Sequence, residues 1–210
     1  MTSRPACAVV ALAVLLTACG LGPPPGEARG PAVFETCATC HGPEGQGMRE
    51  YGAPAIAGLP EWYLRAQLDK FQSGARGAHP DDVQGLRMRG MARSLNHDGD
   101  VDAIVAYVAA LPPAMPADGT GDAENGRALY ATCAQCHGER AAGDEARGAP
   151  PLVHLDAWYV ETQIHNFQGG VRGTSPLDET GRTMQPMALG LADDQSIHDV
   201  VAYIRTLRGS

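Results

Sequence analysis

The sequence of 210 residues is long enough for one large domain or two small ones. Its formal net charge at pH 7 is −8 and it has no basic cluster, which excludes a typical nucleic-acid-binding protein and favours partner proteins with a complementary positive surface. Only 5% of the residues are aromatic, so two small domains would need a further apolar group to complete their cores.

The first 18 residues predict a signal peptide for export. Arg4 supplies the positive charge, and the apolar run from Ala6 to Leu16 is too short to cross a bilayer as a helix. The run ends in Leu-Thr-Ala-Cys at positions 16–19, which resembles a bacterial lipobox, where cleavage leaves the cysteine as a lipid-modified first residue. We therefore expect a periplasmic lipoprotein, anchored to the membrane by acyl chains on Cys19. The alternative is an ordinary secretory signal cut near Ala18, with Cys19 unmodified.

Residues 19–29 are rich in glycine and proline and predict a semi-extended tether between the membrane and the folded part of the chain. With Cys7 in the signal peptide and Cys19 lipidated, four of the six cysteines remain. All four lie in two copies of a Cys-x-x-Cys-His motif, at 37–41 and at 133–137. No cysteine is therefore left for a disulfide.

These two motifs predict two covalently bound haem c groups. Thiols one helical turn apart can each add across a vinyl group of haem, and the histidine that follows is then placed to bind the iron as its proximal ligand. A structural zinc site is the alternative, but each motif supplies only three ligands and no repeated cysteine or histidine provides a fourth. The expected attachment sites are Cys37, Cys40, Cys133 and Cys136, and the expected proximal ligands are His41 and His137.

The motifs belong to a longer internal repeat with a spacing of 96 residues, from 133 − 37. Residues 34–111 and 130–207 align without gaps and share 31 identities in 78 positions, among them Trp62 with Trp158. Two copies of domain size indicate a tandem duplication of one fold. We expect a first domain at 30–113, a linker at 114–121 and a second domain at 122–210, because Pro112 and Pro113 cannot continue a helix.

Each copy predicts three helices joined by long loops, and no stretch alternates as a strand, so the expected fold class is all-α. The first helix covers 31–39 in one copy and 123–135 in the other, where Asp122 is placed to cap it. The second starts near Pro60 or Asp156 and ends at Gly74 or Gly169. The third follows 95–98 or 191–194. In the loop before it lie two methionine pairs, Met88 with Met91 and Met184 with Met187.

Methionine is the better candidate for the second axial ligand of each iron. No histidine outside the two motifs recurs in the other copy, whereas both methionines of each pair do. The residues alone do not decide which methionine of a pair binds, because the other could pack against the porphyrin. The repeated cations Arg76 and Arg172 are candidates for partners of the haem propionates; the alternative for each is a solvated loop charge.

The order Cys-x-x-Cys-His, Gly-x-Pro, Met-x-x-Met and a final helix with Ala-Tyr resembles class I cytochrome c. The tandem di-haem arrangement resembles the cytochrome c4 family over nearly the whole mature chain. In that family the axial methionine lies seven residues before the leucine that leads the last helix. The resemblance therefore implies Met88 before Leu95, and Met184 before Leu191, as ligands, with Met91 and Met187 as packing residues.

The resemblance also implies that the carbonyl groups of Pro54 and Pro150 accept a hydrogen bond from the proximal histidines. Histidine and methionine together close an iron to small substrates, which suits an electron carrier. By resemblance to cytochrome c4, the carrier would pass electrons from a quinol-oxidising complex or a periplasmic dehydrogenase to a terminal oxidase. One alternative is an electron-accepting subunit of a dehydrogenase. A di-haem enzyme such as a peroxidase is disfavoured, because both halves retain the methionines.

Overall fold

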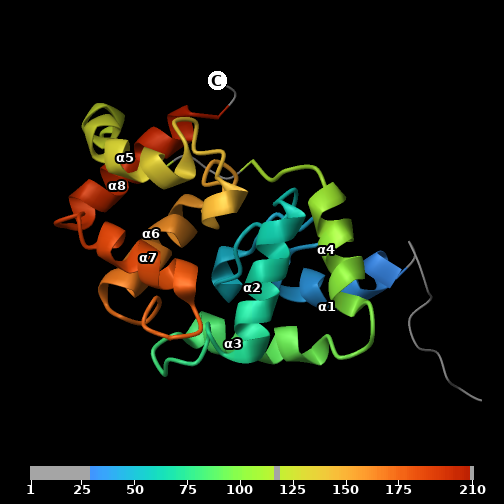
Figure 1. The fold of residues 1–210 in the computed structure, drawn as a ribbon. Coiled ribbons are helices and arrows are strands. Elements are labelled where there is room, and N and C mark those ends of the chain that lie inside the picture. The colour runs from blue at the N-terminus through green and yellow to red at the C-terminus, as the bar shows by residue number, and fades with distance from the viewer. Residues whose placement is uncertain (1–28, 116–118, 209–210) are drawn as a thin grey trace, which may run out of the picture.

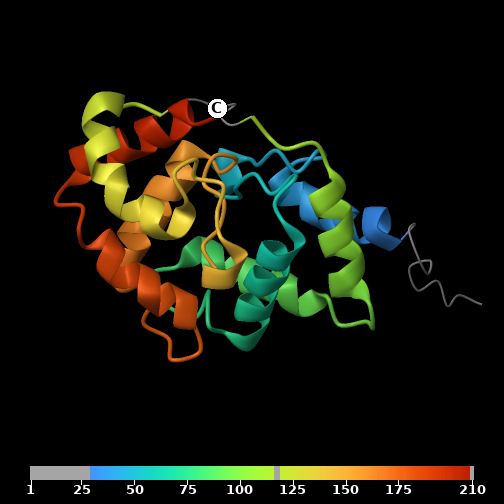
Figure 2. The same cartoon turned by 45° about the horizontal axis from the view of Figure 1, so that its top comes forward.

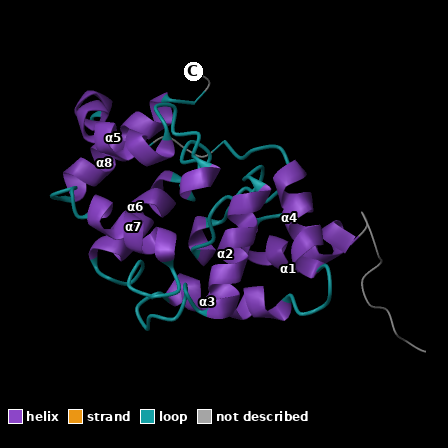
Figure 3. Ribbon diagram, viewed as in Figure 1, coloured by secondary structure: helices purple, strands orange, loops and turns teal. Residues whose placement is uncertain are grey.

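The computed structural model describes residues 29–115 and 119–208. Within these ranges the chain is helical and contains no β-strand, only two isolated bridges, Met48 with Ala53 and Asp144 with Ala149 (Figure 3). The expected all-α class is confirmed. The helices are α1 (Arg29–His41), η2 (Arg49–Tyr51), α2 (Glu61–Ser73), α3 (Val83–Ser94), α4 (Asp100–Ala110), α5 (Ala123–His137), η3 (Glu145–Arg147), α6 (Ala157–Gln168), α7 (Glu179–Ala188) and α8 (Asp194–Thr206).

Two similar halves lie side by side, and each contains the helices of one repeat (Figures 1 and 2). In the first half α1 packs on α4, and in the second α5 packs on α8. Gly30 and Gly126 allow these close crossings. A Cβ atom at Gly30 would lie 2.6 Å from Cβ of Tyr107, and one at Gly126 would lie 1.9 Å from the carbonyl oxygen of Asp199. The crossing fixes the first helix of each domain, whose last turn carries the Cys-x-x-Cys-His motif.

The prediction of three helices in each copy was wrong, because the methionine pairs lie on helices and not in a loop. Met88 and Met91 are on α3, and Met184 and Met187 are on α7. Local sequence gave little sign of these helices. Gly85 and Gly90 in α3 and Gly181 and Pro186 in α7 all weaken an isolated helix.

Capping and tertiary contacts compensate for these weak residues. The carboxylates of Asp82 and Asp178 accept hydrogen bonds from the backbone N–H groups three residues later, at 2.9 Å and 3.0 Å. At the other end of α3, the side-chain amide of Gln72 on α2 donates to the carbonyl oxygens of Ala92 and Leu95. Gln168 makes the same two contacts at the end of α7. Each methionine helix is thus held at both ends.

The other helices follow the expected pattern with small differences in their bounds. α1 and α5 continue through His41 and His137, two residues beyond the expected ends. Asp122 caps α5 as predicted, accepting from the N–H groups of Glu124 and Asn125. α2 ends before Gly74, whose φ of 84° is a left-handed conformation that favours glycine.

The two domains share apolar contacts. Leu59 and Tyr63 of the first domain belong to the same buried cluster as Val153, Leu155 and Val160 of the second. Among the described residues, no helix is both long and apolar enough to cross a bilayer. The expected signal peptide at 1–18 and most of the tether at 19–29, with Cys19, lie outside the described residues.

Candidate haem sites

Each Cys-x-x-Cys-His motif lies in the last turn of its helix and faces a cavity. His41 and His137 are buried, with 9% and 6% of their surface exposed. The imidazole Nδ1 of His41 is 2.7 Å from the carbonyl oxygen of Pro54, and that of His137 is 2.8 Å from the carbonyl oxygen of Pro150. A carbonyl oxygen can only accept, so Nδ1 carries the proton and Nε2 keeps a free lone pair.

Burial lowers the pKa of both imidazoles, and the hydrogen bonds to Pro54 and Pro150 only partly oppose this effect. Each ring is therefore neutral at pH 7, as a metal ligand must be. The hydrogen bond fixes the orientation of the ring and raises the basicity of Nε2. Both histidines are thus prepared to bind iron.

A repeated glycine supports the proline carbonyl in each domain. A Cβ atom at Gly47 would lie 2.4 Å from the backbone nitrogen of Ala55, and one at Gly143 would lie 2.6 Å from that of Pro151. Both glycines have positive φ, 85° and 83°. The loop peptide whose carbonyl oxygen accepts the hydrogen bond from histidine therefore packs on a position where only glycine fits. Sequence reasoning did not single out this pair, although it is repeated.

The cavities bring the expected haem-binding residues together. The first has a volume of about 530 Å³ and is lined by both cysteines of its motif, His41, Pro54 and Met88. The second is smaller, about 140 Å³, and is lined by both cysteines of its motif, His137, Pro150 and Met184. Apolar side chains provide most of both walls. Two thiols, a neutral imidazole and a thioether around an apolar cavity fit a c-type haem.

The two methionines of each pair differ in exposure. Met88 and Met184 are partly buried, and Met184 packs against the core of its domain. Met91 and Met187 also border the cavities but are 40% and 44% exposed. Met88 and Met184 are thus less exposed than Met91 and Met187, and the choice of ligand within each pair stays a prediction.

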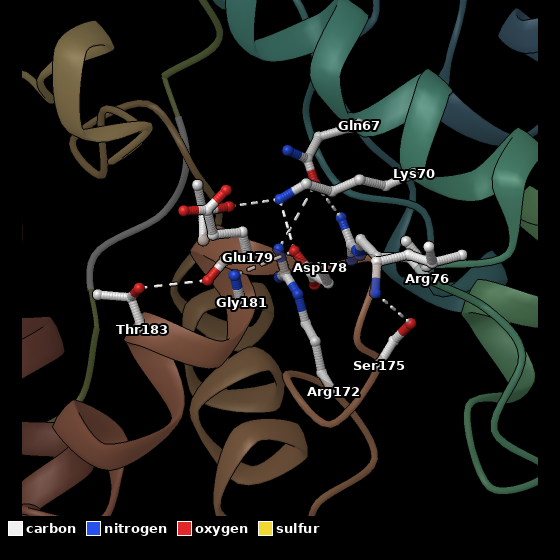
Figure 4. A network of polar contacts seen from close by, with 12 residues as sticks. Gln67, Lys70, Arg76, Arg172, Ser175, Asp178, Glu179, Gly181 and Thr183 are labelled. Carbon is white, nitrogen blue, oxygen red and sulfur yellow. Dashed lines mark hydrogen bonds and ion pairs between the residues drawn. The ribbon is translucent and has the colours of Figure 1, made fainter.

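Arg76, which is buried, and Arg172, which is partly buried, lie in one polar cluster between the domains (Figure 4). Arg76 stacks over Phe71, with 4.5 Å from its Cζ atom to the ring centroid, and Arg172 stacks over Phe167 at 4.6 Å. Each arginine donates to a glutamine of its own domain, Arg76 to Gln67 at 2.6 Å and Arg172 to Gln163 at 2.8 Å. Each also donates across the domain boundary, Arg76 to Tyr159 and Gln163 and Arg172 to Gln67.

The cluster retains donors for a further anion. The Nε atoms of Arg76 and Arg172 are buried and have no hydrogen-bond partner among the described residues. Arg76 lines the first cavity and Arg172 lines the second. Two guanidinium groups beside the cavities, each with a buried and unused Nε–H donor, fit the carboxylates of haem propionates. Five residues line both cavities, which therefore meet at this cluster: Tyr63, Gln67, Leu155, Tyr159 and Gln163.

A second polar contact between the domains involves Lys70, the only lysine of the sequence. Its Nζ atom lies 2.7 Å from Oδ1 of Asp178, which is fully buried (Figure 4). Burial lowers the pKa of Lys70, and the hydrogen bond to Asp178 partly opposes this. Burial alone would raise the pKa of Asp178, but Lys70, together with the charge of Arg172 and the Gly181 N–H, lowers that pKa. The pair links the first domain to the start of α7.

Comparison with known proteins identifies the family. The family model for cytochrome c matches residues 27–112 and 123–208, that is, both domains. The chain belongs to the cytochrome c family. The chain is 34% identical to a thiosulfate dehydrogenase electron acceptor of Stutzerimonas stutzeri over 171 residues, 76% of this chain and 73% of that protein.

Similarity to cytochrome c4 extends over most of the chain. The chain is 28% identical to cytochrome c4 of Azotobacter vinelandii, over 95% of this chain and 98% of that protein. The crystal structure of reduced recombinant cytochrome c4 from Pseudomonas stutzeri matches with a TM-score of 0.66 and 26% identity, over 86% of this chain and 97% of that one. The protein is therefore a di-haem cytochrome c related to cytochrome c4, and it is an electron carrier with two c-type haems.

Proposed function

We propose that this di-haem cytochrome c carries electrons in the bacterial periplasm, held at the membrane by acyl chains on Cys19. His41 and Met88 would hold the iron of the first haem, and His137 and Met184 that of the second. Haem iron supplies a one-electron couple, and a thioether ligand favours its reduced state. The histidine and methionine side chains would leave no iron position free for a substrate, the carbonyl oxygens of Pro54 and Pro150 orient the imidazoles, and the apolar cavity walls would exclude water.

The main support for electron transfer is the shared wall between the cavities. Tyr63, Gln67, Tyr159 and Gln163 line both cavities, so two haems bound there would lie on either side of one layer of side chains. We propose that electrons enter at one domain and leave from the other through this layer. Arg76 and Arg172 would hold the haem propionates there.

We propose a quinol-oxidising complex or a periplasmic dehydrogenase as the electron donor and a terminal oxidase as the acceptor. The 34% identity to a protein named as a thiosulfate dehydrogenase electron acceptor supports a dehydrogenase as donor. A direct test measures the rate of reduction of the purified protein by a thiosulfate dehydrogenase with thiosulfate, and by a quinol-oxidising complex with quinol. The faster donor is the better candidate. Reduction by neither would contradict both routes.

The ligand assignment is tested with four methionine variants. M88A and M184A should each remove about half of the methionine-to-iron charge-transfer band of the oxidised protein. The matched variants M91A and M187A, one helical turn away, should leave the band intact. The assignment is wrong if the second pair abolishes the band and the first does not. Rapid peroxide turnover by the wild-type protein would instead indicate an enzyme.

The membrane anchor is tested by mass spectrometry and fractionation. The intact mass should correspond to a chain that begins at Cys19 with its acyl chains and two covalent haems. C19S should lose the acyl mass and move from the membrane to the soluble periplasmic fraction. A wild-type mass without acyl chains would refute the tether.

A further inference from the structure

The peptide group between Pro54 and Ala55 connects the proximal histidine of the first domain to a carboxylate of the second. Its carbonyl oxygen, on Pro54, lies 2.7 Å from Nδ1 of His41. Its N–H, on Ala55, donates to Oδ2 of Asp156, also at 2.7 Å. Both contacts therefore act on one amide group, and the residues at the two ends come from different domains.

The side chain of Asp156 makes this contact with Ala55 instead of capping its own helix. It is the N-cap residue of α6, where an aspartate normally accepts a hydrogen bond from its own helix. Its side chain makes no such capping bond. The carboxylate crosses the domain boundary to Ala55, whose residue surface is only 1% exposed. A short hydrogen bond from a buried amide to a carboxylate is a strong one.

The duplication did not preserve this arrangement in the second domain. The residue that corresponds to Ala55 is Pro151, which has no N–H to donate. The residue that corresponds to Asp156 is Pro60, which has no carboxylate. The hydrogen bond from His137 to Pro150 is retained at 2.8 Å. The two proximal sites therefore share the hydrogen bond from histidine to a proline carbonyl, but only the first has a carboxylate that accepts from the N–H of the same peptide group.

We infer that Asp156 is a positioning residue that lowers the reduction potential of the first haem through the Pro54–Ala55 peptide. The inference rests on the proposed role of His41 as an axial ligand. A carboxylate that accepts from the amide N–H polarises the amide and makes its carbonyl oxygen a stronger acceptor. The stronger bond increases the electron density of the His41 ring, and a more basic imidazole stabilises ferric over ferrous iron. The second domain, lacking the carboxylate and the N–H, has no such effect.

The first experiment measures both reduction potentials in D156N and D156A. Spectroelectrochemical titration gives the two potentials, and NMR of the shifted haem methyl resonances assigns each to its domain. D156N keeps an acceptor for Ala55 but removes the charge, and D156A removes both. At a fixed applied potential, D156A should raise the ferrous-to-ferric ratio of the first haem about tenfold. This corresponds to an increase of its reduction potential by ~59 mV for a one-electron couple. D156N should give a smaller change in the same direction, and the second haem should not change.

A through-space effect of the charge must be separated from an effect through the peptide. A55P removes the N–H and leaves the carboxylate, and the second domain has Pro-Pro at the same position, so the backbone can accept it. If the peptide transmits the effect, A55P raises the first potential, and D156N adds little in the A55P background. If A55P changes nothing and D156N has its full effect in both backgrounds, the inference is overturned. D102N, which removes an exposed carboxylate of the first domain, is the control for net charge.

A readout that does not depend on the iron is the Ala55 amide proton. In the wild-type protein it should resonate downfield and exchange slowly with solvent, and in D156A it should move upfield and exchange faster. Failure of the proposed closed, methionine-ligated carrier would appear as a wild-type spectrum without the methionine band. Failure of the present inference would appear as an intact band with unchanged potentials in D156A, so the two are distinguishable.

Discussion

Lys70→Met tests how much the contact between Lys70 and Asp178 contributes to stability. The side chain of Lys70 is 16% exposed and that of Asp178 is 0% exposed, so the substitution leaves a buried carboxylate without its cation. Breaking such a pair by removing one partner typically costs about 3–5 kcal/mol. Because the positive charge of Arg172 also lies near Asp178, we expect the lower end of this range, ~3 kcal/mol.

The assay is guanidinium unfolding of the holoprotein, followed by circular dichroism and by haem absorbance so that each domain transition is seen. R65M is the control, because the pair of Arg65 with Asp102 is 41% and 74% exposed and should contribute less than ~1 kcal/mol. K70M/D178N should recover part of the loss, since asparagine still accepts from the Gly181 N–H and carries no charge. A loss in K70M no larger than that in R65M would refute the reasoning.

Three further predictions concern the histidine loop, the acid stability and the methionine helix. G47A should lower the free energy of unfolding by ~2 kcal/mol or more, because alanine at φ 85° is strained and its Cβ would meet the backbone of Pro54 and Ala55. A denaturation midpoint within error of wild type contradicts this. Burial alone would raise the pKa of Asp100, but Arg29 and the His97 N–H lower it. The ionised Asp100 carboxylate therefore stabilises the folded protein above about pH 4, and this stabilisation is lost as the pH falls through the lower pKa of the folded state. D100N should flatten this part of the curve of denaturation midpoint against pH; an equally steep curve excludes the assignment. Q72A removes two hydrogen bonds at the end of α3 and should lower the free energy of unfolding by ~1–2 kcal/mol. It should also speed cyanide binding at the first iron only. Q168A is the counterpart for the second iron.

The missed helices show where prediction from sequence was limited. The amphipathic pattern of α4 and α8 was visible because their aliphatic residues repeat at helical spacing. In α3 and α7 the pattern was hidden by Gly85, Gly90, Gly181 and Pro186. These helices depend on aspartate caps and on glutamine side chains from a neighbouring helix, and such long-range contacts leave no local signal.

The haem attachment residues, the duplication and the all-α class follow from the sequence alone. They depend on covalent chemistry between residues one turn apart and on a repeat that can be counted, and neither requires knowledge of the fold. The contact of Asp156 with Ala55, the pair of Lys70 with Asp178 and the crossing of the arginines between domains were decided only by the tertiary structure. The first two of these contacts join residues about a hundred positions apart. Each contains a side chain that the other domain lacks, because Pro60 stands in the place of Asp156 and Asn166 in the place of Lys70. Each depends on how the domains pack, because a side chain finds a distant partner only after the apolar surfaces between them are buried.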